Sequence, residues 1–113
     1  MHEFGIAKNI FDAVSEEVKK RDISRVISIK LEIGKLTAII PSALEFCFET
    51  IIEGTLLEGS KLDIIDIPLK MKCKKCSHIF EVKDYSYNCP LCESTNYEMI
   101  SGDELLIKNL EVE

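Results

Sequence analysis

Apolar residues recur at helical spacing near the N-terminus of the chain, from Phe4 to about Arg21. They share one side of an ideal helix, and charged residues fill the other positions. The apolar positions are Ile6, Ile10, Phe11, Val14 and Val18. This pattern predicts an amphipathic helix that buries one face.

A period of two replaces the helical period after this segment. Ile27, Ile29, Leu31 and Ile33 alternate with polar residues, and Gly34 ends the run. Such alternation is typical of a strand with one buried and one solvated face. We therefore predict a strand in a half-solvated sheet.

A second helix is predicted to begin near Pro41 and Ser42, because proline suits the first helical turn. Gly54 can adopt the left-handed conformation that ends many helices. The apolar stripe between these signals consists of Leu44, Cys47, Phe48, Ile51 and Ile52. We expect this helix to pack beside the first one.

Two strand patterns in the second half of the chain change phase along their length. Leu62 and Ile64 alternate with Asp63, and then the apolar phase shifts to a set comprising Ile65, Ile67, Leu69 and Met71. The shift predicts a bend or bulge, and Pro68 predicts an edge or exit position. A last strand is predicted from about Glu104 to Val112, where the apolar phase also shifts.

A cysteine-rich segment lies between these strands, from Cys73 to about Tyr97. Its two ends are expected to return to one sheet. The predicted fold is α+β, with two helices packed on a small mixed sheet and an inserted zinc-ribbon-like knuckle lobe. The predicted domains are residues 1–70 with 104–113, and the insertion 71–103.

The composition narrows the functional classes. The chain has 113 residues, a formal net charge of −6 and a pI near 5.0, so it has no overall attraction for phosphate or anionic lipid. No apolar run approaches the roughly 18 residues of a membrane span, and no secretory signal is recognisable. We expect a cytoplasmic protein, where paired cysteines favour metal over disulfides.

Four of the five cysteines form two pairs with metal-ligand spacing: Cys73 with Cys76, and Cys89 with Cys92. A two-residue spacer lets both thiolates of a pair reach one tetrahedral ion, so the pattern predicts a structural zinc site. Four thiolates leave no open position for substrate, which argues against a catalytic ion. Iron is an alternative occupant that the spacing alone does not exclude.

Other residues near the cysteines have simpler interpretations. Lysines at 70, 72, 74 and 75 lie close in sequence to Phe80, Tyr85 and Tyr87, which leaves nucleic-acid binding as an alternative, but solvated lysines and packed aromatics are favoured. His78 could replace a cysteine as ligand or act beside the ligands, but four cysteines already complete the set, so a local structural role is favoured. Cys47 is interpreted as a small apolar residue of the second helix.

The Met1-His2-Glu3 sequence precedes the first helix and holds one of only two histidines. The α-amine of Met1, the backbone nitrogen of His2 and its imidazole could form fused chelate rings that suit square-planar nickel or copper. Glu3 could add an oxygen or orient the imidazole. The simpler interpretation is an exposed histidine and a first-turn carboxylate favoured by the helix dipole.

Several motifs together resemble the HypA family of hydrogenase maturation proteins. They are Met1-His2-Glu3, LEIGKL at 31–36, PSALEFCFE at 41–49, EGTLLEG at 53–59, both CxxC pairs, and ISGDEL near the end. They span nearly the whole chain in the order of the family.

The resemblance implies a nickel metallochaperone and not an enzyme. It implies Ni(II) binding by His2 with the Met1 amine and neighbouring backbone nitrogens, with Glu3 as a contributor or a positioning group. It implies Zn(II) binding by Cys73, Cys76, Cys89 and Cys92. The implied partners are a HypB-type GTPase and the precursor of the nickel–iron hydrogenase large subunit. Monomer and homodimer both stay open, as does service to urease.

A function of a different class is a zinc-ribbon adaptor that binds protein or nucleic acid without transferring nickel. Catalysis by the chain itself has no support in the sequence, which contains no Gly-rich phosphate loop and no nucleophile–base pattern. Nickel binding by a protein with a free N-terminus separates the adaptor from the metallochaperone.

Overall fold

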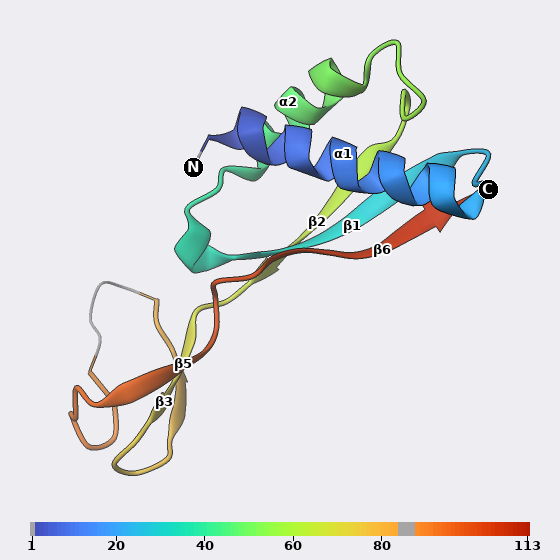
Figure 1. Ribbon diagram of the computed structural model, residues 1–113. Coiled ribbons are helices and arrows are strands. Elements are labelled where there is room, and N and C mark those ends of the chain that lie inside the picture. Colours follow the sequence, from blue (N-terminus) through green and yellow to red (C-terminus); the bar gives the residue numbers. More distant parts are fainter. Residues whose placement is uncertain (1, 84–87) are drawn as a thin grey trace. The chain divides into compact units, whose positions relative to one another are not determined.

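The computed structural model describes residues 2–83 and 88–113 (Figure 1). Two compact units make up the chain. The helical unit consists of Met1–Glu32, Ile39–Ile65 and Leu106–Glu113, and the cysteine unit consists of Ile33–Ala38 and Asp66–Leu105. The functional division into residues 1–70 with 104–113 and residues 71–103 stays a prediction.

Helix α1 spans Glu3–Arg21, which confirms the first predicted helix. Ile6, Ile10 and Val14 on its apolar stripe are buried. The helix ends at Asp22, which is left-handed with φ 52°, and the N–H of Ile23 closes the last turn onto the Val18 carbonyl at 3.1 Å.

Helix α2 spans Pro41–Ile52 and begins with proline in its first turn, as predicted. Leu44 and Phe48 are completely buried, and the helix packs against α1. Gly54 follows the helix with φ 75°, which confirms its left-handed conformation. Figure 1 shows both helices on the same face of the sheet of the helical unit.

That sheet has the strand order β2-β1-β6, with β1 at Val26–Gly34, β2 at Lys61–Ile67 and β6 at Leu105–Val112. Strand β6 is antiparallel to β1, because the N–H of Glu113 donates to the Arg25 carbonyl while that of Gly34 donates to the Glu104 carbonyl. The predicted last strand is thereby confirmed.

Strands β1 and β2 run in the same direction. The Ser60 hydroxyl donates to the Val26 carbonyl at the start of both strands, and Lys30 pairs with Asp63 further along. Helix α2 is therefore the crossover of a β-α-β unit. The sheet combines parallel and antiparallel pairs, so the predicted α+β class with a mixed sheet is confirmed.

One part of the predicted β1 pattern is wrong. Ile29, Leu31 and Ile33 are buried, but Ile27 is 36% exposed and Val26 is buried in its place. The alternation is broken near the start of the strand. The Ser60 side chain bonds to the Val26 carbonyl there, and the strict period of two begins at Ile29.

The predicted phase shift between Ile64 and Ile65 lies inside β2, and the break between two strands comes after Ile67. Strand β2 ends at Ile67, and β3 begins at Lys70 and runs to Cys73 in a second sheet. Pro68 lies between them, where its missing N–H costs no ladder bond. Strand β2 is an edge strand, so the predicted exit position of Pro68 is confirmed.

The second sheet has the order β4-β3-β5, with β4 at Ile79–Glu81 and β5 at Tyr97–Ser101. Both pairs are antiparallel, and the β3–β5 register shifts between Lys70 and Met71. The buried core of this sheet consists of Leu69, Met71, Cys73, Phe80, Val82 and Cys89. Cysteine ligand positions thus belong to the apolar core of the unit.

Two glycines make a close backbone contact in the cysteine unit. A Cβ at Gly34 would lie 2.1 Å from the Gly102 carbonyl oxygen. The N–H of Leu36, in the 3₁₀ turn Lys35–Thr37, donates to the same carbonyl at 2.8 Å. Only glycine fits at position 34 without moving this backbone. In the described part of the chain no helix is long and apolar enough to cross a membrane.

Candidate metal centre

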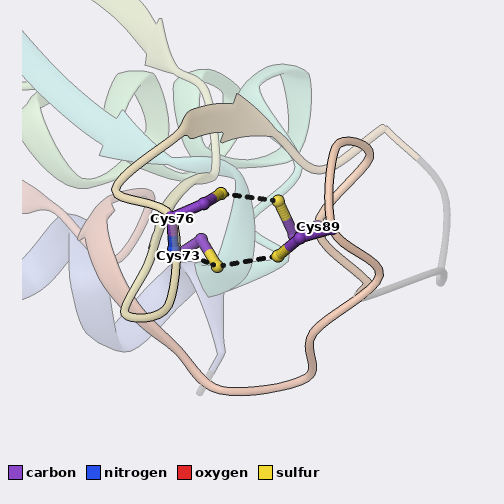
Figure 2. A group of neighbouring side chains, drawn as sticks. Cys73, Cys76 and Cys89 are labelled. Atoms are coloured by element: carbon purple, nitrogen blue, oxygen red, sulfur yellow. Dashed lines mark hydrogen bonds between the residues drawn. The ribbon is translucent and has the colours of Figure 1, made fainter.

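Four cysteine sulfurs come together at one end of the second sheet. The Sγ atoms of Cys73 and Cys92 are 3.5 Å apart, and those of Cys76 and Cys89 are 3.6 Å apart. All four lie within 4.8 Å of one another. Figure 2 shows three of these side chains, Cys73, Cys76 and Cys89, pointing toward one another.

These separations suit one tetrahedral ion. With Zn–S bonds of about 2.3 Å, the sulfurs of a regular tetrahedron lie about 3.8 Å apart. The observed closest pairs are slightly shorter and the upper bound of 4.8 Å is longer, so small rotations about the Cα–Cβ bonds equalise them. The donor set fits zinc with no further ligand from the chain.

The two CxxC turns have the same backbone pattern. The N–H of Cys73 donates to the His78 carbonyl, and the N–H of Cys89 donates to the carbonyl of Ser94, five residues on in each case. The residues after each second cysteine, Ser77 and Glu93, are left-handed with φ 65° and 61°. Two matching knuckles therefore face one another across the sulfurs.

Left-handed backbone at Ser77 and Glu93 was not predicted from the sequence. Glycine at these two positions would have been the signal, and the chain has serine and glutamate there. The N–H of Ser77 donates to the Cys73 carbonyl at 2.9 Å and that of Glu93 to the Cys89 carbonyl at 2.8 Å. These bonds hold each knuckle in a conformation that the local residue types do not favour.

Backbone N–H groups also stabilise the thiolate form of cysteine, which is the form that binds metal. The N–H of Cys76 donates to the Cys73 sulfur at 3.5 Å and lowers the pKa of that thiol to about 6. The N–H of His78 acts to lower the pKa of Cys76, but partial desolvation of its sulfur and the thiols of Cys89, Cys92 and Cys73 outweigh this effect and raise the pKa to about 12. Neighbouring thiolates repel one another, so a cation is needed to keep all four ionised.

The cysteines differ in their access to solvent. Cys73 and Cys89 are buried, Cys92 is half-buried and Cys76 is exposed. The fifth cysteine, Cys47, is interpreted from the sequence as a small apolar residue and not as a ligand. It is half-buried on α2 and is not part of the cluster. The ion position is therefore closed by core residues on one side and open toward Cys76 on the other.

His78 lies outside the four-cysteine group. Its ring stacks on Phe80, with 6.3 Å between centroids, and Phe80 meets Tyr97 edge to face at 6.2 Å. These contacts fit a packing role for His78 beside the first knuckle. Tyr85 and Tyr87, considered above as nucleic-acid contacts, lie outside the described residues.

The second candidate site is the N-terminus. His2 is exposed, has extended backbone at φ −87° and ψ 138°, and makes no side-chain cap bond to α1. Met1, predicted to contribute its α-amine, lies outside the described residues. The imidazole of His2 is therefore accessible at the start of the helix.

Glu3 is already engaged by the fold. Its Oε2 accepts a hydrogen bond from the backbone N–H of Ile40 at 3.3 Å. Its own backbone N–H and that of Ile40 lower the pKa of the carboxyl. The sequence did not predict this partner; Ile40 precedes Pro41 and has extended backbone, with its N–H outside the α2 ladder.

The fold and the sulfur cluster define a small metal-binding protein with a four-cysteine site in a knuckle unit. Residues 1–112 match the family model "HypA: Hydrogenase/urease nickel incorporation, metallochaperone, hypA". The chain belongs to the HypA family of nickel-incorporation metallochaperones, which confirms the resemblance in its motifs.

Curated relatives agree along nearly their full length. Hydrogenase maturation factor HypA of Trichodesmium erythraeum is 45% identical over 113 residues, which covers 100% of this chain and 96% of the relative. The protein of the same name from Geobacter sulfurreducens is 38% identical, with 100% of both chains covered.

Solved structures also match. The solution structure of the nickel metallochaperone HypA from Helicobacter pylori has a TM-score of 0.68 at 29% identity, over 99% of this chain and 97% of that one. A second solution structure, of HypA protein, has a TM-score of 0.73 at 30% identity, with 99% and 96% covered. Family and fold therefore agree.

Proposed function

We propose that this protein binds Ni(II) at its N-terminus and delivers it to the precursor of the nickel–iron hydrogenase large subunit. The observation that carries the proposal is the exposed His2 directly before α1 in a member of a nickel-incorporation family. Within the described residues, the four cysteines are the one group of three or more metal-binding side chains. They form a complete tetrahedral set, so nickel cargo needs other donors.

The proposed nickel donors are nitrogen atoms at the beginning of the chain. They are the Met1 α-amine, the backbone nitrogen of His2 and the His2 imidazole, a set that suits square-planar Ni(II). Glu3 acts mainly by positioning, because its carboxylate is bound to the Ile40 N–H. An exposed terminus also suits a carrier, since the recipient's ligands can reach the metal.

The proposed role of zinc is structural. Cys73, Cys76, Cys89 and Cys92 would hold Zn(II), whose charge stabilises four thiolates inside a unit with a small apolar core. Zinc binding of about 10–16 kcal/mol in comparable motifs is enough to fold such a unit. We assign nickel to the domain 1–70 with 104–113 and zinc to the domain 71–103.

The remaining assignments follow from this role. The protein is a non-enzymatic carrier in the cytoplasm, and its partners are a HypB-type GTPase and the large-subunit precursor. It works as a monomer or a homodimer without nucleic acid or membrane. Nickel incorporation in the family description and the complete thiolate set support these assignments.

The two histidines of the chain allow a matched test. Protein with no residues before Met1 is dialysed against Ni(II), and bound nickel and zinc are measured for wild type, His2→Ala and His78→Ala. We expect His2→Ala to lose nickel binding by at least about a hundredfold in affinity while keeping zinc. His78→Ala should keep both metals, because its ring packs on Phe80.

Nickel bound equally well by His2→Ala would overturn the N-terminal site. Wild type that binds no nickel, yet retains zinc, would instead support the zinc-ribbon adaptor. Delivery is tested separately by adding nickel-loaded protein to a metal-free large-subunit precursor and measuring nickel transfer. Transfer no faster than from free Ni(II) would overturn delivery.

A further inference from the structure

A groove of about 900 Å³ lies in the helical unit, between the second half of α1 and strand β6. Both elements are near the C-terminal end of the chain in Figure 1. The apolar side chains that line it are Ala13, Val14, Ile23, Ile107, Leu110 and Val112. The groove thus combines a helix wall with a strand wall.

The strand wall is also a free sheet edge. Strand β6 comes last in the order β2-β1-β6 of the described strands, so only one of its edges is paired. The N–H of Glu113 points to β1, where it bonds the Arg25 carbonyl at 3.0 Å. Backbone direction alternates between neighbouring residues, so Val112 and Leu110, one and three residues before Glu113, direct their N–H and C=O groups to the free edge. The alternation changes phase earlier in β6, between the half-buried Ile107 and Leu110, because the Glu104 carbonyl also faces β1.

The same two residues supply both kinds of contact. Leu110 and Val112 have side chains in the groove and backbone groups on the adjoining edge. An added strand would therefore gain main-chain hydrogen bonds while placing alternate side chains between α1 and β6. A helix in the groove would leave those backbone groups without partners.

Charges around the groove favour a basic group on the occupant. Glu17 pairs with Arg21 at 2.8 Å, and Lys108 pairs with Glu32 at 3.7 Å. Glu16 also lines the groove and is exposed, and it forms no ion pair with any described residue. Its carboxylate is thus available to a lysine or arginine on an incoming segment.

We propose that this groove binds an extended segment of a partner protein, which adds to β6 as a further strand. The segment carries apolar side chains at alternate positions and a basic residue that faces Glu16. Helix α1 rises about 1.5 Å per residue, so Ala13 lies roughly 16 Å along the helix from His2. A bound strand therefore leaves the start of α1 accessible.

Random heptapeptides displayed on phage, selected on the wild-type protein, provide the probe. We expect enrichment of sequences with alternating apolar residues and a lysine or arginine. The best peptide is then synthesised, and its affinity is measured by fluorescence anisotropy for wild type, Val112→Pro, Val112→Ala and Glu16→Lys. Amide hydrogen exchange with and without peptide shows which backbone groups become protected.

Val112→Pro removes one outward N–H without touching the ladder to β1, so we expect it to weaken binding at least about tenfold. Val112→Ala keeps that N–H and should stay within about threefold of wild type. Glu16→Lys should weaken binding more at low than at high salt. Peptide should slow exchange at Leu110 and Val112.

Three results would overturn the proposal. The first is no enrichment of alternating sequences, and the second is equal binding to Val112→Pro with its thermal unfolding unchanged. The third is a wild-type protein that binds no peptide but forms a concentration-dependent dimer in sedimentation, which Val112→Pro abolishes. The occupant of the groove would then be a second copy of the chain. If Val112→Pro loses thermal stability, its binding result is set aside and the other two measurements decide. Glu16→Lys must then weaken binding more at low salt, and peptide must slow exchange at Leu110 and Val112; failure of either overturns the proposal.

Discussion

The carboxylate of Glu3 accepts a hydrogen bond from the backbone N–H of Ile40, with 3.3 Å between Oε2 and N. The bond joins the first turn of α1 to the residue that precedes α2, across 37 positions of sequence. It also fixes the side chain beside His2. The N-terminal site therefore depends on how the two helices begin.

Glu3→Gln and Glu3→Ala should separate positioning from coordination. Glutamine retains an oxygen that accepts the Ile40 N–H, so we expect nickel affinity within about threefold of wild type. Alanine loses the bond, and we expect affinity to fall about tenfold or more, because the start of α1 is less ordered. Equilibrium nickel binding checks this, and equal loss in both variants would indicate that the charged carboxylate is itself a ligand.

The same bond should respond to acid. The folded protein lowers the Glu3 pKa from 4.5, so the carboxylate contributes stability above about pH 4.5 and loses it as pH falls through the lower folded value. We expect exchange of the Ile40 amide to quicken in that range relative to the amide of Leu44, which is bonded within α2. Exchange of the two amides that changes in parallel with pH would contradict this prediction. The same pH dependence of Ile40 exchange in Glu3→Gln as in wild type would also contradict it, because glutamine does not titrate.

Gly34→Ala should destabilise the cysteine unit. Its methyl group would lie 2.1 Å from the Gly102 carbonyl oxygen, so the backbone must shift. Shifts of this kind typically lower the free energy of unfolding by about 1–3 kcal/mol or more. Gly5→Ala is the matched control, because a Cβ there meets nothing within 4 Å and alanine favours helix by about 0.5–1 kcal/mol. Urea unfolding should show opposite changes in the free energy of unfolding for the two variants.

Cys73→Ala should release zinc and unfold the second sheet. The side chain is fully buried, and its loss removes one of the four donors. Cys47→Ala is the control, because this cysteine lies on α2 outside the cluster. Metal analysis should find a full zinc equivalent only in the control, and amide spectra should show α1 and α2 intact in both. Full zinc in Cys73→Ala would show that the ligand set is wrong.

Periodicity in the sequence was enough to predict both helices and strands β1, β2 and β6, but it merged β3 with β2 and did not predict β4 and β5. Burial of one face of a helix or strand depends mainly on local spacing. This is why the pattern correctly predicted burial of Ile10 and Val14 on α1 and of Ile29, Leu31 and Ile33 on β1. It failed at Ile27, which is exposed beside the buried Val26, whose carbonyl accepts a hydrogen bond from the distant Ser60. It also did not show that β2 and β3 enter different sheets.

For the sites, the sequence by itself determined the residue types and spacing: two CxxC pairs for one tetrahedral ion, and a histidine at position 2. The tertiary structure alone decided that Ser77 and Glu93 would be left-handed, that Glu3 would bond Ile40, and that β6 would be a free edge beside α1. Spacing within a turn is a local property of the chain. Contacts between distant segments depend on packing, which local residue patterns do not encode.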